Sequence, residues 1–182
     1  MRARTRKPVA LFDEDSLYNY AVKVLGQQMR TVAEVKRLLR RRVEPGEGGE
    51  AKVEAVVGRL KERKYLDDAG YAQDFTRLRQ ENARFGKRRV EQDLMRKGVE
   101  ATVIGKTLDA AYENVDEEEL ARRHLERKRV KKPASEKEAA RVVRQLIRAG
   151  FSSGVIFLIL KKWDVKAEGL ELGEEATAGF SD

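Results

Sequence analysis

The repeat that decides the fold is clearest in residues 71–99, which read YAQDFTRLRQENARFGKRRVEQDLMRKGV. The stretch opens at Tyr71 in an apolar-periodic segment, and a strongly basic segment with apolar anchors at Val90 and Leu94 follows. Gly98 closes the basic segment, because glycine readily adopts the left-handed conformation that ends many helices. A third amphipathic segment begins after this break, so the stretch belongs to a unit of three helices.

This order of features occurs three times along the chain, at a spacing of about fifty residues. The copies open at Tyr20, Tyr71 and Leu120, and the anchors of their basic segments are Val35 and Leu39, Val90 and Leu94, and Val142 and Leu146. Each copy is too short to bury its apolar face alone, so neighbouring copies must stack. No segment shows a convincing strand pattern. The sequence therefore predicts an all-α fold of three tandem three-helix repeats, which are helix-turn-helix-like units.

Changes in composition suggest the boundaries of these repeats. We predict a flexible basic arm at 1–14, three-helix repeats at 15–66, 67–115 and 116–165, and an acidic disordered tail at 166–182. The chain carries a net charge of +8, of which the tail contributes −4 and the three repeats together +10. Such a basic body favours a polyanionic partner, nucleic acid first.

Local signals predict several helix starts and one loop. Thr31, with Glu34 three residues later, has the spacing of a capping box. Asp67 and Asp68 are expected to cap the helix that follows them, since carboxylates stabilise a first helical turn. The glycine-rich segment 44–49 is expected to form a loop.

Two further expectations concern the packing of the second copy and the length of a helix in the third. Tyr71, Phe75 and Leu78 fall on one helical face, which we expect to be buried. The first helix of the third copy is expected to run to about Lys132 and to end at Pro133, because proline cannot continue a helix.

The residue types needed for most catalytic sites are missing from this sequence. There is no cysteine, and the only histidine, His124, lies in a charged helix and is expected at the surface. The acidic clusters at 13–15, 67–68 and 116–119 leave open a Mg²⁺-dependent nuclease, but each stands at a predicted helix start, where capping explains it. We therefore predict no catalytic residue, no cofactor and no metal site.

The lack of cysteine and the hydropathy of the chain also bear on its location. No stretch approaches the ~20 apolar residues that a membrane-spanning helix needs. A chain without cysteine fits a reducing compartment. We expect a cytoplasmic protein that does not bind membranes.

The middle helix of each repeat concentrates positive charge. The residues that we predict to contact nucleic acid are Arg37, Arg40, Arg41, Lys87, Arg88, Arg89, Arg96, Lys97, Arg141, Arg144 and Arg148. Stacked in register, the three clusters would form one stripe along a phosphate backbone, to which the planar fork of arginine is well suited. The alternative is an ordinary solvated face, partly neutralised by Glu91, Asp93 and Glu138. Few aromatic residues interleave these charges, so binding is expected to be electrostatic rather than sequence-specific.

The second repeat resembles the central signature of the RecX family, regulators of the RecA recombinase. The residues that carry the resemblance are Tyr65-Leu66-Asp67-Asp68, Tyr71-Ala72, Phe75, Gly86, Arg89, Leu94 and Lys97-Gly98-Val99. Residues around the opening Tyr20-Ala21 and the closing Gly150-Phe151 match the flanking repeats, so the resemblance covers roughly 15–163. The first repeat departs from the pattern, because it has no glycine at its break near Val43.

The resemblance implies an elongated, curved array of three repeats that binds along the groove of the RecA–single-stranded DNA filament. It further implies inhibition of filament extension, ATP hydrolysis, strand exchange and coprotease activity by a protein that is not itself an enzyme. Partners are then RecA, the RecA–DNA filament and single- or double-stranded DNA, and the protein is expected to be a monomer. The alternative is a general nucleic-acid-binding helical module without a recombinase partner.

Overall fold

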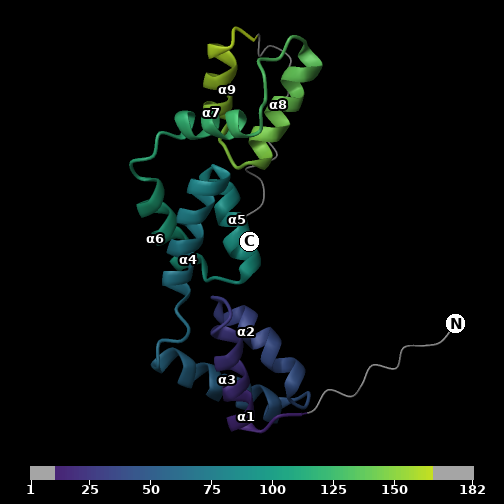
Figure 1. Ribbon diagram of the computed structural model, residues 1–182, viewed down its shortest axis with the longest axis vertical. Coiled ribbons are helices and arrows are strands. Elements are labelled where there is room, and N and C mark those ends of the chain that lie inside the picture. Colours follow the sequence, from purple (N-terminus) through teal and green to yellow (C-terminus); the bar gives the residue numbers. More distant parts are fainter. Residues whose placement is uncertain (1–10, 166–182) are drawn as a thin grey trace, which may run out of the picture. The chain divides into compact units, whose positions relative to one another are not determined.

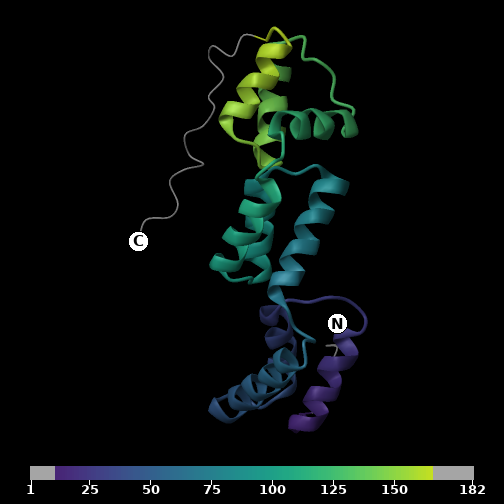
Figure 2. The same ribbon diagram turned by 90° about the vertical axis from the view of Figure 1, so that its left-hand side faces the viewer.

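The computed structural model describes residues 11–165, which form α-helices joined by short turns (Figures 1 and 2). The arm and the tail predicted at the two ends lie wholly or mostly outside this range. In order, the elements are α1 (Glu14–Leu25), α2 (Val32–Leu39), η1 (Arg40–Arg42), α3 (Glu47–Glu62), α4 (Asp68–Leu78), η2 (Arg79–Ala83), α5 (Lys87–Lys97), α6 (Ala101–Tyr112), α7 (Glu117–Arg127), α8 (Glu136–Arg148) and α9 (Ser153–Lys162). The described residues contain no strand, so the all-α prediction is confirmed.

The described chain divides into two compact units. Unit 1 comprises the described residues up to Asp74 together with Leu94–Thr107, and unit 2 comprises Phe75–Asp93 together with the described residues from Leu108 onward. The division passes through α4, α5 and α6, so each unit contains part of the middle repeat.

Unit 1 is built around the three helices of the first repeat. The residues of its core are fully or almost fully buried, and they are Leu17, Tyr18, Ala21, Val35, Leu39, Val43, Val53, Val56, Val57, Leu60 and Leu66. On α3 the buried side chains recur at helical spacing, which is the apolar stripe that its sequence predicts. This packing supplies the apolar burial that stabilises the short α2, since eight residues form too short a helix to be stable alone.

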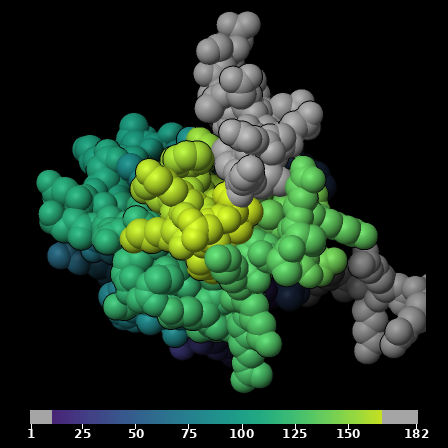
Figure 3. Space-filling model, turned by 90° about the horizontal axis from the view of Figure 1, so that it is seen from above, coloured from purple at the N-terminus to yellow at the C-terminus, as the bar shows by residue number. Residues whose placement is uncertain are grey.

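Unit 2 buries the apolar faces of α7, α8 and α9. Leu125, Leu146, Ile156 and Leu160 are each at most 1% exposed. Helix α9, yellow in the space-filling view, reaches the surface (Figure 3). Its Phe157 is about half exposed. This helix therefore contributes to the core on one side only.

Most predicted helix ends are found in the structure. The Asp13 side chain accepts a hydrogen bond from the Ser16 amide at the start of α1, and Thr31 and Glu34 form the complete capping box of α2. Gly98 has φ +77°, the left-handed conformation expected after α5. Short-range capping chemistry was therefore a sound guide to these boundaries.

Two predicted boundaries were wrong. The loop expected at 44–49 is shorter, because α3 already begins at Glu47 and Gly49 is buried against the Glu44 carbonyl. Helix α7 ends at Arg127 rather than near Pro133, since Arg129 adopts a left-handed conformation and the Val130 amide bonds back to the Leu125 carbonyl. This closure satisfies the last carbonyls of the helix before proline is reached.

The buried face of α4 also differs from the prediction. Tyr71 is buried, but Phe75 is only half-buried and Leu78 is 46% exposed. The helix instead buries Ala72 and Thr76, which lie one turn apart, and it passes into the π-helical turn η2 directly after Leu78. The buried face of α4 therefore faces away from Phe75 and Leu78.

The described residues include no helix that is both long and apolar enough to span a membrane.

Candidate nucleic-acid interface

The first predicted cluster lies on α2 and η1 in unit 1, and its arginines differ in their contacts. Arg37 and Arg41 are exposed. Arg40 forms a two-pronged contact with Glu50, with Nε–Oε1 and Nη2–Oε2 distances of 2.8 Å each. An anionic ligand would have to compete with this carboxylate for Arg40, whereas it meets Arg37 and Arg41 at the surface.

Lys97 has a structural role at the junction of α5 with α2 in unit 1. Its Nζ atom lies 2.7 Å from Oε1 of Glu34, and this hydrogen bond raises the pKa of the Lys97 ammonium. The Thr31 hydroxyl donates to the Lys97 carbonyl at 2.6 Å. An alanine Cβ at position 98, in place of Gly98, would lie 2.4 Å from the Cβ of Ala33, so the backbones approach closely here. Lys97 therefore holds the junction together rather than facing a ligand alone.

Asp67 and Asp68 have different partners, although both were expected to cap α4. Asp67 accepts the amides of Ala69 and Gly70, as predicted for a cap. Asp68 instead accepts the Val32 amide, at 2.9 Å, and thereby caps α2 across the junction. The prediction for Asp68 was therefore wrong about the helix that it caps.

The second cluster, on α5, divides in a similar way. Lys87 pairs with Asp109 at 2.7 Å. Arg88 and Arg96 are exposed, and Arg96 also interacts within the protein. The Arg89 guanidinium lies 5.4 Å from the centre of the Phe85 ring, and its Nε atom lies 3.2 Å from Oδ1 of Asp93. These contacts fix the direction of the Arg89 side chain.

Backbone contacts join the start of α5 to the end of α8 in unit 2. The Gly86 amide donates to the Ala149 carbonyl at 2.9 Å, and Nη1 of Arg89 donates to the Arg148 carbonyl at 3.3 Å. A Cβ at Gly86 would lie 2.4 Å from the Gly150 carbonyl oxygen, and one at Gly150 would lie 2.2 Å from the backbone nitrogen of Arg89. The junction therefore leaves no room for a side chain at either glycine.

This junction forms one wall of a cleft of about 510 Å³ in unit 2. The residues that line it are Phe85, Arg89, His124, Lys128, Arg141, Gln145, Arg148 and Ala149. Four of them carry positive charge and none carries a carboxylate. The volume is typical of a ligand site, and the charge favours an anion.

The structure brings only three of the eleven predicted residues into this cleft: Arg89, Arg141 and Arg148. Arg144 lies on the same helix but is exposed outside the cleft. Lys128 lines the cleft although the prediction omitted it, because it follows the last residue of α7 rather than lying on a middle helix. No sequence pattern pointed to Lys128.

His124 is the main error of the sequence-based prediction. It is only 2% exposed, and its Nδ1 lies 2.9 Å from the Ala83 carbonyl, with Phe85 and Phe151 packed nearby. Burial lowers the pKa of the imidazole. The signal was present in the sequence, since His124 shares the apolar face of Leu120 and Ala121.

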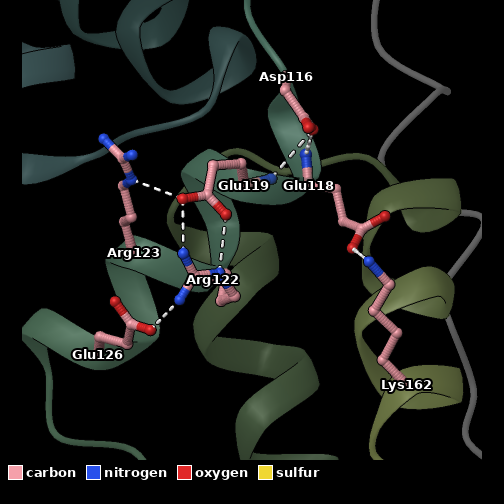
Figure 4. A network of polar contacts seen from close by, with 7 residues as sticks. All are labelled: Asp116, Glu118, Glu119, Arg122, Arg123, Glu126 and Lys162. Atoms are coloured by element: carbon pink, nitrogen blue, oxygen red, sulfur yellow. Dashed lines mark hydrogen bonds and ion pairs between the residues drawn. The ribbon is translucent and has the colours of Figure 1, made fainter.

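Cations on the outer face of α7 contrast with those of the cleft, because nearby carboxylates neutralise them (Figure 4). Glu119 accepts hydrogen bonds from both Arg122 and Arg123, which lower the pKa of its carboxyl to about 2. Lys162 of α9 pairs with Glu118. Positive charge on this face is therefore engaged within the protein.

Comparison with known proteins gives consistent matches. Residues 67–108 match the family model for the second three-helix domain of RecX, and residues 116–160 match the one for the third. The regulatory protein RecX of Leptothrix cholodnii is 36% identical over 149 residues, which cover 82% of this chain and 90% of that protein. The regulatory protein RecX of Geobacillus thermodenitrificans is 32% identical, and the match covers 79% of this chain but only 52% of that longer protein.

Two crystal structures share the fold. RecX from Lactobacillus salivarius superposes with a TM-score of 0.67 at 20% identity, over 83% of this chain and 96% of that chain. Another structure, of a regulatory protein RecX, gives a TM-score of 0.68 at 25% identity, over 81% of this chain and 71% of that chain.

Proposed function

This chain belongs to the RecX family, and on that premise we propose that it regulates the RecA recombinase by binding along the RecA–single-stranded DNA filament. In this proposal it limits filament extension, ATP hydrolysis, strand exchange and coprotease activity, and it acts by binding rather than by catalysis. The observation that carries the proposal is the 36% identity to a regulatory protein RecX across 90% of that protein.

The contacts with DNA are proposed to come from the cations of the basic helices. Those exposed outside the cleft are Arg37, Arg41, Arg88, Arg96 and Arg144. Arg40, Lys87 and Lys97 are proposed to contribute less, because each is already paired with a carboxylate in the protein. Exposed ion pairs are weak, so these residues can still add to long-range attraction.

Repeated weak contacts are enough for such a regulator. A chain that carries several linked binding surfaces gains avidity, because the first contact raises the effective concentration of the others. A helical filament offers the same surface on successive subunits. Small amounts of the protein are therefore expected to act on a long filament.

The test is ATP hydrolysis by RecA from the same organism on preformed filaments, with this protein added in substoichiometric amounts. We expect strong inhibition that persists when free single-stranded DNA is added in excess. A variant with Arg37→Glu and Arg88→Glu serves as the comparison, and it is expected to inhibit less.

The second candidate function, a general nucleic-acid-binding module, is favoured by the net charge of +8 alone. Inhibition that requires enough protein to coat the DNA would support this alternative. No inhibition at any ratio would contradict regulation of RecA.

A further inference from the structure

The cations of the unit 2 cleft are an unusual feature of this surface. Lys128, Arg141 and Arg148 line one cavity, and the structure shows no carboxylate paired with any of the three within residues 11–165. By contrast, Lys87, Arg122 and Arg123 in the same unit all have acidic partners. Like charges that share a cavity repel one another, so an anion that enters the cleft reduces this repulsion.

The fourth cation of the cleft, Arg89, is held in a defined orientation. Asp93, the Phe85 ring and the Arg148 carbonyl all contact its guanidinium. The side chain therefore loses little conformational freedom when it binds a ligand, which favours affinity. Asp93 neutralises part of its charge, so the other three cations carry most of the attraction for an anion.

We propose that this cleft binds the phosphodiester backbone of nucleic acid, with Arg141, Arg148 and Lys128 as the phosphate contacts. Guanidinium groups bind phosphate oxygens through two parallel hydrogen bonds, and the Gln145 amide adds a further donor. Phe85 and Ala149 provide an apolar surface for the sugar. The inference rests on the proposed nucleic-acid contact of this chain and assigns it to one site, which includes Lys128.

Helix α8 offers a matched control. All three arginines of this helix are exposed, but Arg141 and Arg148 line the cleft whereas Arg144 does not. The variants to compare are Arg141→Glu with Arg148→Glu, Lys128→Glu, and Arg144→Glu. Binding of labelled oligothymidylate is measured by fluorescence anisotropy over a range of salt concentrations, with a duplex of equal length as a second ligand.

In the Arg141/Arg148 and Lys128 variants, we expect the salt dependence of single-strand binding to flatten by about 0.7 for each phosphate that the protein no longer neutralises. The Arg144→Glu variant reverses one charge outside the cleft, so it should flatten the slope by less than the Lys128→Glu variant, which reverses one charge inside it. An equal decrease of slope in the Arg144→Glu variant would overturn the proposal, because it would mean diffuse attraction by the whole surface. A decrease confined to one of the two ligands would identify the form of nucleic acid that the cleft binds.

A second measurement avoids mutation altogether. In amide NMR spectra of the unaltered protein, oligothymidylate should shift the signals of Gly86 and Gly150, which flank the cleft, more than that of Gly58 in α3. Poly-glutamate that shifts them equally would contradict a phosphate site. If the cleft variants bind DNA normally and still inhibit RecA, the cleft proposal fails and the proposed function stands. If the unaltered protein does not inhibit RecA but the cleft variants lose DNA binding, the proposed function fails and the cleft proposal stands.

Discussion

Replacement of Gly150 by alanine is the sharpest test of the junction between α5 and α8. Gly150 has φ +88°, which an alanine adopts only with strain. The new methyl group would also lie 2.2 Å from the backbone nitrogen of Arg89 and 2.5 Å from the Arg89 Cβ. Neither atom can rotate away, because both belong to the rigid part of α5.

The cost follows from these two effects. A left-handed conformation at a residue other than glycine costs roughly 1–2 kcal/mol. Forcing a methyl group into a packed site costs about 1–3 kcal/mol more, since the backbone has to shift. We therefore expect Gly150→Ala to lower the free energy of unfolding by about 2–5 kcal/mol.

The assay is urea unfolding followed by circular dichroism, with Gly154→Ala as the control. Gly154 lies in the first turn of α9 in the same unit, and a Cβ there meets only the Ser152 hydroxyl, at 4.0 Å. This control should be neutral or stabilising by up to about 1 kcal/mol. A cost below about 1 kcal/mol for Gly150→Ala would refute the close backbone contact.

Three further predictions concern stability. Thr31→Ala should cost about 2 kcal/mol, because the variant lacks both the cap of α2 and the hydrogen bond to the Lys97 carbonyl; Thr31→Ser should recover most of it in the same assay. Phe75→Ala should cost about 1–2 kcal/mol, which is less than the roughly 3–5 kcal/mol for truncation of a fully buried phenylalanine. A decrease in the thermal denaturation midpoint that corresponds to about 3–5 kcal/mol would contradict the half-buried position of Phe75. Because the pKa of His124 is lowered in the folded protein, the unfolded chain binds the proton at a higher pH. When the pH is reduced from 7.5 to 5, the free energy of unfolding should therefore decrease once the pH is below about 6.5. His124→Asn should remove that part of the decrease.

The sequence predicted what is decided within a few residues. The capping box at Thr31 and the left-handed Gly98 each depend on neighbours along the chain, and both were confirmed. The repeat of apolar anchors likewise predicted the all-α fold, and the anchors Val90 and Leu94 are fully buried in the structure. Local chemistry and helical periodicity are readable without a structure.

What the sequence did not predict depends on residues that are distant along the chain. Asp68 caps a helix that begins 36 residues earlier, and Arg40 meets Glu50 across a turn. The cleft combines α5, α7 and α8, so no single segment carries its pattern. Among the eleven predicted cations, only the fold shows that Arg141 lines the cleft whereas Arg144 does not.

The contact between Gly86 and Gly150 requires that side chains be absent rather than that a particular chemical group be present. The closest approaches of the junction are between backbone atoms, so they do not depend on the charge of Arg88, Arg141 or Arg144. Substitutions at Arg88, Arg141 or Arg144 can therefore alter affinity for an anionic ligand at little cost to folding. Such an architecture lets the binding affinity change through the arginines while Gly86 and Gly150 keep the contact between α5 and α8.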